Sequence, residues 1–486
     1  MGMNFTEPSY YFAFLPAAIL FVWLTRRKVG SQLRVLLMMS YIFFILASGW
    51  HLILLITSTI VDWAAGGKIH NSEDEGIRKR WLILSIGTNL SLLGLFKYLD
   101  FIIRSLGIGA LKIGIDIGVE EIGLLLPVGI SFYTFQTMSY TIDIYRRKGT
   151  PADSFVEFAC YAAFFPQLVA GPIVRFSEFR TQLSGPLSLE RSRAKLAITL
   201  IVYGIVKKFV FADNFAFQVN AIFVDGAPLD NPVLIYWGAL LFGLQIFCDF
   251  SAYTDIALGS AHLFGIKLPE NFKSPYKSRT PREFWRRWHI SLSTWLRDYL
   301  YISLGGSRNG KIRMYLALSV TMALGGLWHG ASWNFVLWGC IHGTILIAHR
   351  IISETKYNMG LRKSLPRAHS IFSWVATQWL IFLSWLIFRI EDTSMLIRSI
   401  KTYCLIDLDQ DVGEALNFLP GRNNVTFVLL VFFIIFHGLS SLSDGSLKYR
   451  IVELGQNKWG ALMGAMLTIA IILRPTETVE FIYFRF

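Results

Sequence analysis

Apolar stretches recur along almost the whole chain and constrain its fold more than any other feature. Some approach the ~20 residues that a helix needs to cross a bilayer, and shorter ones indicate tilted, re-entrant or interfacial segments. We therefore predict an all-α, polytopic membrane protein with about eleven to thirteen crossings. The stretches are residues 10–24, 36–48, 51–63, 81–98, 124–140, 158–174, 196–211, 233–250, 315–327, 332–348, 371–388, 425–439 and 462–472.

The overall composition agrees with a membrane protein. The chain is 53% hydrophobic and 16% charged, whereas soluble domains average ~25% charged residues. Lys and Arg outnumber Asp and Glu by 46 to 33. Basic loops on the cytoplasmic side explain this excess better than nucleic-acid binding, because no basic stripe lies on a polar domain. The four cysteines form no CxxC pair, which argues against a disulfide framework.

The positions of basic residues predict the orientation. Clusters at 26–28 and 78–80 follow the first and third apolar stretches and fit the cytoplasmic side. Lys448, Arg450 and Lys458 precede the last stretch, which would then run outward. Both termini are therefore expected outside, and an even number of crossings, about twelve, is favoured. The first stretch lacks a basic region before it and a cleavage site after it, so we expect a retained helix.

Two blocks combine apolar and ionisable residues. In EFWRRWHISLSTWLRDYLYISLGG (283–306), aromatic and leucine residues recur at spacings of three and four. This predicts an amphipathic helix at the membrane surface or beside a polar cavity, with His289 on the flank of its apolar face. In GGLWHGASWNFVLWGCIHG (325–343), the two glycines allow close approach of a backbone or ligand and would loosen a helix at a cavity. His329 follows them, and an imidazole can transfer protons near neutral pH.

Several alternatives to a catalytic role stay open from the residues alone. His289 and His329 could be structural histidines that are bonded to backbone groups, and His342 could simply pack. A zinc site formed by these three histidines lacks an HxxxH or cysteine pair in support. Cys340 has no charged neighbour that would activate it as a nucleophile.

These two blocks resemble the membrane-bound O-acyltransferase family, and most closely the branch that acetylates exported alginate. The resemblance covers most of the chain. Further matching blocks are LLPVGISFYTFQTMSYTIDIYR (125–146), FFPQLVAGPIVRF (164–176), FCDFSAYTDIALG (247–259) and ENFKSPY (270–276). It implies one integral-membrane domain over residues 1–486, folded as a ring of tilted transmembrane helices around a central tunnel. A histidine that lines a solvated tunnel avoids the cost of contact with lipid.

The resemblance also implies the site. The family's invariant histidine falls on His329 through its LWHG context, and the partner position falls on His289. Acyl transfer needs a base for the hydroxyl nucleophile, which would be His329, and donors for the oxyanion, which His289 or a tryptophan N–H could supply. Asp249, Tyr253 and Asp255 are interpreted as a structural or cavity-lining network.

Acetyl-CoA is the acyl donor that the resemblance implies, with no bound cofactor and no metal. Its phosphates would suit a group of basic residues on the cytoplasmic side, although ordinary positive-inside charge is an equal alternative for each of them. These residues are Lys277, Arg279, Arg282, Arg286 and Arg287.

The predicted function is O-acetylation of an exported, alginate-like polysaccharide from the bacterial inner membrane. Expected partners are the lipid bilayer, a separate extracytoplasmic acetyltransferase and, through it, the polysaccharide, with no nucleic acid. Peptidoglycan O-acetylation and teichoic-acid D-alanylation are alternatives in the same superfamily. A transporter or channel is a different class, and the sequence lacks the repeated halves that are common in transporters.

The chain ends in FIYFRF, which matches F-x-Y-x-x-F through Phe481, Tyr483 and Phe486. This resembles the terminal motif of the single-helix partner in teichoic-acid D-alanylation, whose tyrosine is thought to carry the acyl group. By that resemblance, residues 459–486 would be a fused acyl-carrier element whose tail folds back into the tunnel mouth. Tyr483 would then receive the acetyl group. The alternative is an interfacial belt of aromatic residues.

Overall fold

The computed structural model describes residues 3–25, 28–118, 120–183, 185, 191–405, 412–419, 423–442, 447–476 and 479–482. All regular elements in these residues are helical, with no strand among them, which confirms the predicted all-α class. Within the described ranges, five helical stretches are long and apolar enough to cross a bilayer. They are Val29–Asn71, Glu75–Lys112, Pro232–Leu263, Trp333–Ser353 and Pro366–Arg389. The count of about twelve crossings stays a prediction.

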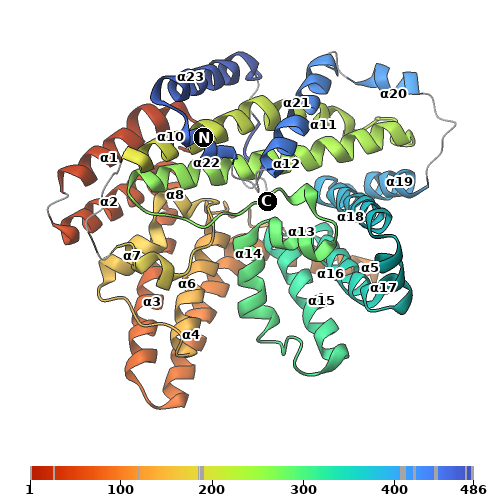
Figure 1. The fold of residues 1–486 in the computed structure, drawn as a ribbon. Helices are drawn as coiled ribbons and strands as arrows, with labels where there is room; N and C mark the ends of the chain where they lie inside the picture. The colour runs from red at the N-terminus through yellow and green to blue at the C-terminus, as the bar shows by residue number, and fades with distance from the viewer. Residues whose placement is uncertain are drawn as a thin grey trace. The chain divides into compact units, whose positions relative to one another are not determined.

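The chain forms two compact units, and the boundary between them passes through two helices, α10 (Arg191–Val206) and α12 (Pro232–Leu263) (Figure 1). Unit 1 comprises Met1–Ile201 and Ile256–Pro269, and unit 2 comprises Val202–Asp255 and Glu270–Phe486.

Unit 1 packs apolar helices around a small polar cluster. The chain reverses between α2 (Val29–Ser48) and α3 (Leu52–Asn71) at Gly49, whose φ of +62° favours glycine. On α3, Asp62 accepts hydrogen bonds from Ser85 Oγ (2.6 Å) and Asn89 Nδ2 (2.9 Å) of α4 (Glu75–Leu93), which offset the cost of burying its carboxyl group. The other elements of this unit are η1 (Tyr10–Phe14), α1 (Leu15–Leu24), η2 (Gly49–His51), η3 (Gly94–Tyr98), α5 (Leu99–Lys112), α6 (Ile130–Tyr145), α7 (Phe155–Ala163), α8 (Phe165–Leu168) and α9 (Phe176–Arg180).

Unit 2 contains both candidate histidines. Its aromatic core includes Trp288, Trp338 and Trp385, each 1% exposed. The other elements are η4 (Lys207–Ala212), α11 (Asp213–Ile222), η5 (Pro275–Lys277), α13 (Pro281–Arg287), α14 (Ile290–Trp295), η6 (Leu296–Tyr301), α15 (Gly310–His329), α16 (Trp333–Ser353), α17 (Lys356–Ser364), α18 (Pro366–Arg389), α19 (Thr393–Cys404), α20 (Val412–Phe418), α21 (Asn423–Leu442), α22 (Leu447–Glu453) and α23 (Gln456–Leu473).

Glycines bring α15 and α16 of this unit into close contact. A Cβ atom on Gly326 would overlap the carbonyl oxygen of Phe335 and lie 3.0 Å from Gly339 Cα. The expected close backbone approach is therefore confirmed. The expected loosening of the helix is wrong, because α15 continues through Gly325 and Gly326 to His329. Packing against α16 holds this glycine pair in helical conformation.

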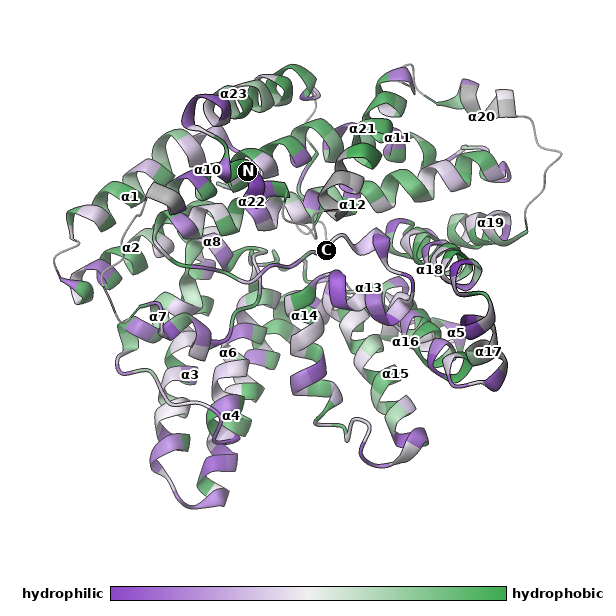
Figure 2. Ribbon diagram, in the orientation of Figure 1, coloured by the Kyte–Doolittle hydropathy of each residue, from purple (hydrophilic) through white to green (hydrophobic). Residues whose placement is uncertain are grey.

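Large apolar side chains are exposed on the outer helices. Phe372 of α18 is 70% exposed, Phe432 of α21 is 61% exposed and Ile471 of α23 is 75% exposed. Figure 2 shows the hydrophobic colour along α21. Soluble monomers rarely expose large apolar patches. These side chains therefore suit a lipid environment, as the prediction of a membrane protein requires.

Candidate active site

His329 ends α15 and is 3% exposed. The turn that follows depends on Gly330, because a Cβ atom there would overlap the ring of Phe335. Ser332 then begins α16 by accepting a hydrogen bond from the backbone N–H of Asn334 (3.2 Å). The helix end therefore places His329 in the interior, between the two apolar helices α15 and α16.

His289 lies at a break between two helices. The expected single amphipathic helix over 283–306 is wrong, because α13 ends at Arg287 and α14 begins at Ile290. His289 has the left-handed φ of 42°, which is uncommon for a residue with a side chain. It is 0% exposed and lies between the two helices rather than on the flank of one continuous helix.

Asn271, which precedes α13 in the chain, stabilises the break between α13 and α14 through two hydrogen bonds. Its backbone oxygen accepts from the N–H of Ile290 (3.0 Å), and its side-chain Oδ1 accepts from the N–H of Ser291 (3.1 Å). Asn271 is itself 0% exposed. These two bonds pair the first N–H groups of α14 and stabilise the turn in which His289 adopts its left-handed conformation.

The two histidines face one cluster of aromatic rings. The ring centroids of His289 and His329 are 6.3 Å apart, with an interplanar angle of 61°. Trp328 lies 5.8 Å from the His289 ring, and Trp338 lies 5.2 Å from the His329 ring. The structure therefore brings together the pair that the sequence predicted across 40 residues, while their catalytic roles stay predictions.

Burial lowers the pKa of His289 to about 3. Water is excluded from the ring, and the cationic form is therefore disfavoured. His289 is thus neutral at physiological pH. A neutral imidazole can offer one N–H donor and one acceptor to a reacting group.

His342 lies one turn beyond Trp338 on α16. Its Nε2 is 3.1 Å from Ser384 Oγ on α18, and Ser384 Oγ donates to the backbone oxygen of Ile381 (2.7 Å). His342 therefore has the packed environment that one of the sequence alternatives described. Within the described ranges, no group of three or more His, Cys, Asp or Glu side chains is placed to hold a metal.

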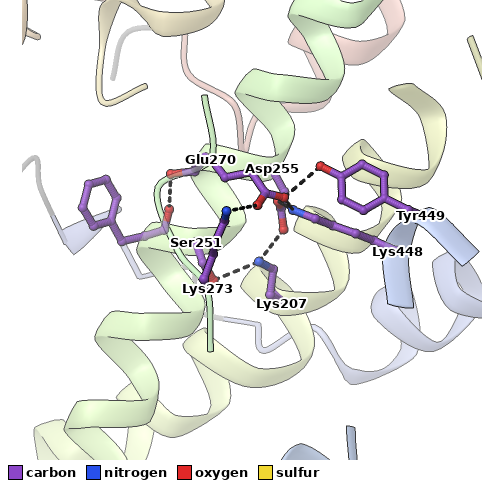
Figure 3. Close-up of polar contacts among 9 residues, drawn as sticks. Lys207, Ser251, Asp255, Glu270, Lys273, Lys448 and Tyr449 are labelled. Atoms are coloured by element: carbon purple, nitrogen blue, oxygen red, sulfur yellow. Dashed lines mark hydrogen bonds and ion pairs between the residues drawn. The ribbon is translucent and has the colours of Figure 1, made fainter. Parts of the chain in front are cut away.

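Asp249 and Asp255 of α12 belong to two buried ion clusters. Asp255 pairs with Lys207 Nζ (2.5 Å) and Lys448 Nζ (3.1 Å), and Lys448 also reaches Glu270 (3.1 Å) (Figure 3). Both aspartates are thus buried and ion-paired, but they lie in separate clusters, and the prediction of one network of Asp249, Tyr253 and Asp255 is not confirmed. Lys448 is 12% exposed at its side chain and ion-paired, so it is not the free loop charge used to orient the last stretch.

The second cluster centres on Lys208. Its Nζ lies 2.8 Å from both Asp213 Oδ1 and Asp249 Oδ1. Lys207 and Lys208 are functional candidates that the sequence analysis missed. Two lysines inside the apolar stretch 196–211 were the available signal, because such charges are costly without a partner.

The five predicted donor-binding residues have different environments. Lys277, Arg279, Arg282 and Arg286 are exposed. Arg287 is engaged within the protein, because its Nε donates to Glu283 (2.9 Å) and its guanidinium also donates to the backbone oxygen of Lys273 (3.1 Å). An incoming phosphate can reach exposed side chains most readily, so the four exposed residues are favoured over Arg287 as donor-binding residues.

A cavity of about 870 Å³ lies beside Arg279. Helices α16, α17 and α18 form its walls, and His349, Arg362 and His369 add polar groups. Of the five predicted basic residues, Arg279 alone lines it. The α16 residue Ile345 also lines it, and seven residues of helix, about 10 Å, separate that position from Trp338 beside His329.

The C-terminal segment enters the interior of unit 2. Phe481 and Ile482 are 3% and 5% exposed. The Phe481 ring packs in a tilted arrangement on Tyr253, with centroids 4.6 Å apart, and Phe250 packs edge-on against His289 at 4.7 Å. Tyr483 and Phe486 lie outside the described residues. The described part of the tail therefore packs near His289, while its entry into a tunnel mouth and the carrier role of Tyr483 stay predictions.

Comparison with known proteins identifies the class. The sequence profile of the membrane-bound O-acyltransferase family matches residues 150–388. A probable alginate O-acetylase of Pseudomonas aeruginosa is 35% identical over 94% of this chain and 85% of its own length. The chain belongs to the membrane-bound O-acyltransferase family. It has that family's membrane fold and is an O-acyltransferase.

Relatives with other named activities match as well. A peptidoglycan O-acetyltransferase of Helicobacter pylori is 33% identical over 85% of this chain and 83% of its own length. A teichoic acid D-alanyltransferase of Streptococcus thermophilus is 31% identical over 54% of this chain and 68% of its own length. The two O-acetylating relatives therefore share far more of the chain than the D-alanylating one.

Proposed function

We propose that this enzyme moves acetyl groups from cytoplasmic acetyl-CoA across the bacterial inner membrane, for O-acetylation of an exported, alginate-like polysaccharide. The buried pair of His289 and His329 carries the proposal, because acyl transfer to a hydroxyl needs a base and polar groups in a water-excluded site. The similarity to a probable alginate O-acetylase supports the acceptor class.

In the proposed reaction His329 is the general base. It takes the proton of a hydroxyl, whose oxygen attacks the thioester carbonyl carbon, and the carbon–sulfur bond then breaks to release the thiol of CoA. His289 and Trp338 are placed to stabilise the oxyanion. Within the described part of the chain, the Trp338 indole N–H has no hydrogen-bond partner, and its ring is 5.2 Å from His329.

The donor is proposed to enter through the cavity beside Arg279. The guanidinium would pair with CoA phosphates on the cytoplasmic side, with Lys277, Arg282 and Arg286 as further exposed cations. From there α16 leads toward His329, and His342 lies along the way. The proposed path thus has a charged entrance and an apolar, aromatic end.

Tyr483 is the proposed first acceptor. Its hydroxyl would lose a proton to His329 and form an acetyl ester. A separate extracytoplasmic transferase would then move the acetyl group to the polysaccharide and regenerate the phenol. The burial of Phe481 and its packing on Tyr253 support a docked tail rather than an interfacial belt. This route requires both termini on the external side; of the basic residues used to orient the last stretch, Arg450 and Lys458 are exposed and still favour that orientation.

Peptidoglycan is the second candidate acceptor, because the Helicobacter pylori relative matches 85% of the chain. The catalytic step would be the same, and only the external transferase and its polymer would differ. Acetate analysis of purified exopolysaccharide and of peptidoglycan, from cells with and without the gene, separates the two. Loss of acetate from peptidoglycan alone would reject the alginate-like acceptor.

Purified protein in proteoliposomes tests the proposed function. Labelled acetyl-CoA is supplied on the cytoplasmic face, and protein-bound label is measured in the wild type and in Tyr483→Phe, which keeps the ring and removes the nucleophile. We expect label on the wild-type tail and none on the variant. Undiminished polymer acetylation by the variant would reject the carrier. A solute flux without any acetyl label would instead support a transporter.

A further inference from the structure

We propose that Lys208, Asp213 and Asp249 form a lock that positions the C-terminal segment beside His289. The three side chains are buried, at 4%, 1% and 3% exposure. They come from η4, α11 and α12, which are far from the tail in sequence. The consequence for transfer rests on the proposed carrier role of the tail, whereas the lock itself rests on hydrogen bonds and ion pairs within unit 2.

The lock forms hydrogen bonds to the main chain of the tail at two residues, Val479 and Ile482. Lys208 Nζ donates to the backbone oxygen of Val479 (2.9 Å), and Asp249 Oδ2 accepts from the backbone N–H of Ile482 (2.7 Å). Asn214 adds a third bond, from Nδ2 to the backbone oxygen of Leu473 (2.9 Å), where α23 ends. Bonds to main-chain atoms fix the path of a segment whatever its side chains are, and charged groups make such bonds stronger.

The charges in the lock are unequal. Two carboxylates face one ammonium group, so the cluster carries one excess negative charge when all three are ionised. A buried excess charge is unfavourable unless further donors approach it. The tail supplies the N–H of Ile482, and Arg474 adds positive charge near Asp213, with its guanidinium 4.8 Å over the Phe209 ring. The C-terminal segment therefore supplies a hydrogen-bond donor and a positive charge to the carboxylates of the cluster.

The locked segment is linked to the candidate site by packed rings. Phe481 lies 4.6 Å from Tyr253 and 6.2 Å from Phe250, and Phe250 lies 4.7 Å from His289. The lock holds the main chain of Ile482, which directly precedes the proposed carrier Tyr483. Restriction of this kind would favour the transfer that the proposed function assigns to Tyr483.

Lys207 provides a matched control. It precedes Lys208 in the same π-helical segment, is 9% exposed at its side chain and pairs with Asp255 at 2.5 Å. Its cluster includes Lys448 of α22 and none of the lock contacts to residues 473–482. Lys207→Met and Lys208→Met each remove one buried cation, but only the second removes a bond to the tail.

Limited digestion with a carboxypeptidase tests the lock directly. Full-length wild type, Lys207→Met and Lys208→Met are digested in detergent, and the masses of the products are measured. We expect residues up to Ile482 to stay protected in the wild type and in Lys207→Met, and digestion of Lys208→Met to continue past Val479. Equal protection in Lys208→Met and wild type would overturn the proposal, as would equal loss of protection in both variants.

A double-mutant cycle tests the link to transfer. Polymer acetylation is measured for Lys208→Met, Phe481→Ala and the combination, with Lys207→Met in place of Lys208→Met as the control cycle. If both residues act by positioning the tail, the double variant should be no more than about twofold worse than the more severe single variant, and Lys208→Arg should recover part of the activity. Multiplicative losses equal to those of the control cycle would reject the positioning role.

Two further variants, Asp249→Asn and Tyr483→Phe, separate failure of the lock from misfolding and from failure of the carrier proposal. If Lys208→Met does not accumulate as folded protein, Asp249→Asn replaces it, because the amide oxygen can still accept from Ile482 while the charge is lost. We then expect partial trimming, and full wild-type protection would count against the lock. If Tyr483→Phe acetylates polymer normally, the carrier proposal fails, yet the digestion result still decides whether the lock exists.

Discussion

Gly326→Ala is expected to damage the contact between α15 and α16. The added methyl group would overlap the Phe335 carbonyl oxygen and lie 3.0 Å from both Gly339 N and Gly339 Cα. These are backbone atoms, which cannot rotate away as a side chain can, so the two helices must separate. Overpacking of this kind costs about 1–3 kcal/mol, and alanine's better helix propensity returns up to about 1 kcal/mol. We expect a net destabilisation of about 1 kcal/mol, and of up to about 2 kcal/mol if the helices cannot relax.

The change should also reduce catalysis, because Gly326 lies one helical turn before His329 and α16 carries Trp338. Gly343→Ala is the control in the same interface, since its methyl group would lie 3.4 Å from Met322 Cβ, an ordinary contact. Thermal unfolding in detergent and acetyl transfer are measured for both variants. We expect Gly326→Ala alone to unfold earlier and to transfer more slowly. Equal unfolding temperatures and equal transfer rates for Gly326→Ala and Gly343→Ala would contradict this prediction.

Three further predictions concern single side chains. Trp338→Phe keeps an aromatic ring but removes the indole N–H, so the turnover rate should fall about a hundredfold or more in protein that still folds; an unchanged rate would exclude Trp338 as an oxyanion donor. Arg279→Ala should raise the KM for acetyl-CoA more than Arg287→Ala does, and the reverse order would argue against the cavity as the donor entrance. The His289 pKa of about 3 lies below the ordinary ~6.5, so its stabilising contribution is complete above pH 6.5 and declines as pH falls toward 3. Wild-type stability should therefore drop more steeply than that of His289→Ala below pH 6.5, by up to ~1.4 kcal/mol per pH unit, and parallel curves would contradict this.

The membrane class and His329 could be predicted from sequence because both depend on local patterns. Long apolar stretches indicate membrane helices, and a histidine followed by glycine and a new helix cap marks a helix end. The position of His329 at the end of α15 follows from that pattern. The environment of His289 could not be predicted in the same way, because its left-handed conformation depends on bonds from Asn271.

The buried ion clusters show a second limit. Lys207 and Lys208 are visible as costly charges in an apolar stretch, but sequence spacing alone does not reveal that one pairs with Asp255 and the other with Asp249. Lys448 shows the opposite error, since a basic residue counted as a loop charge is buried among carboxylates. Pairing over such distances is a property of the packed fold rather than of local pattern.

Acetyl transfer by His329→Ala in full-length, folded protein tests the central claim most directly. The variant and the wild type are reconstituted with labelled acetyl-CoA, and the acetyl group on the C-terminal peptide is measured by mass spectrometry alongside polymer acetylation. If His329 is the base, both signals should be lost while the unfolding temperature stays near that of the wild type. Polymer acetylation above one tenth of the wild-type rate, a barrier change below ~1.4 kcal/mol, would contradict the account.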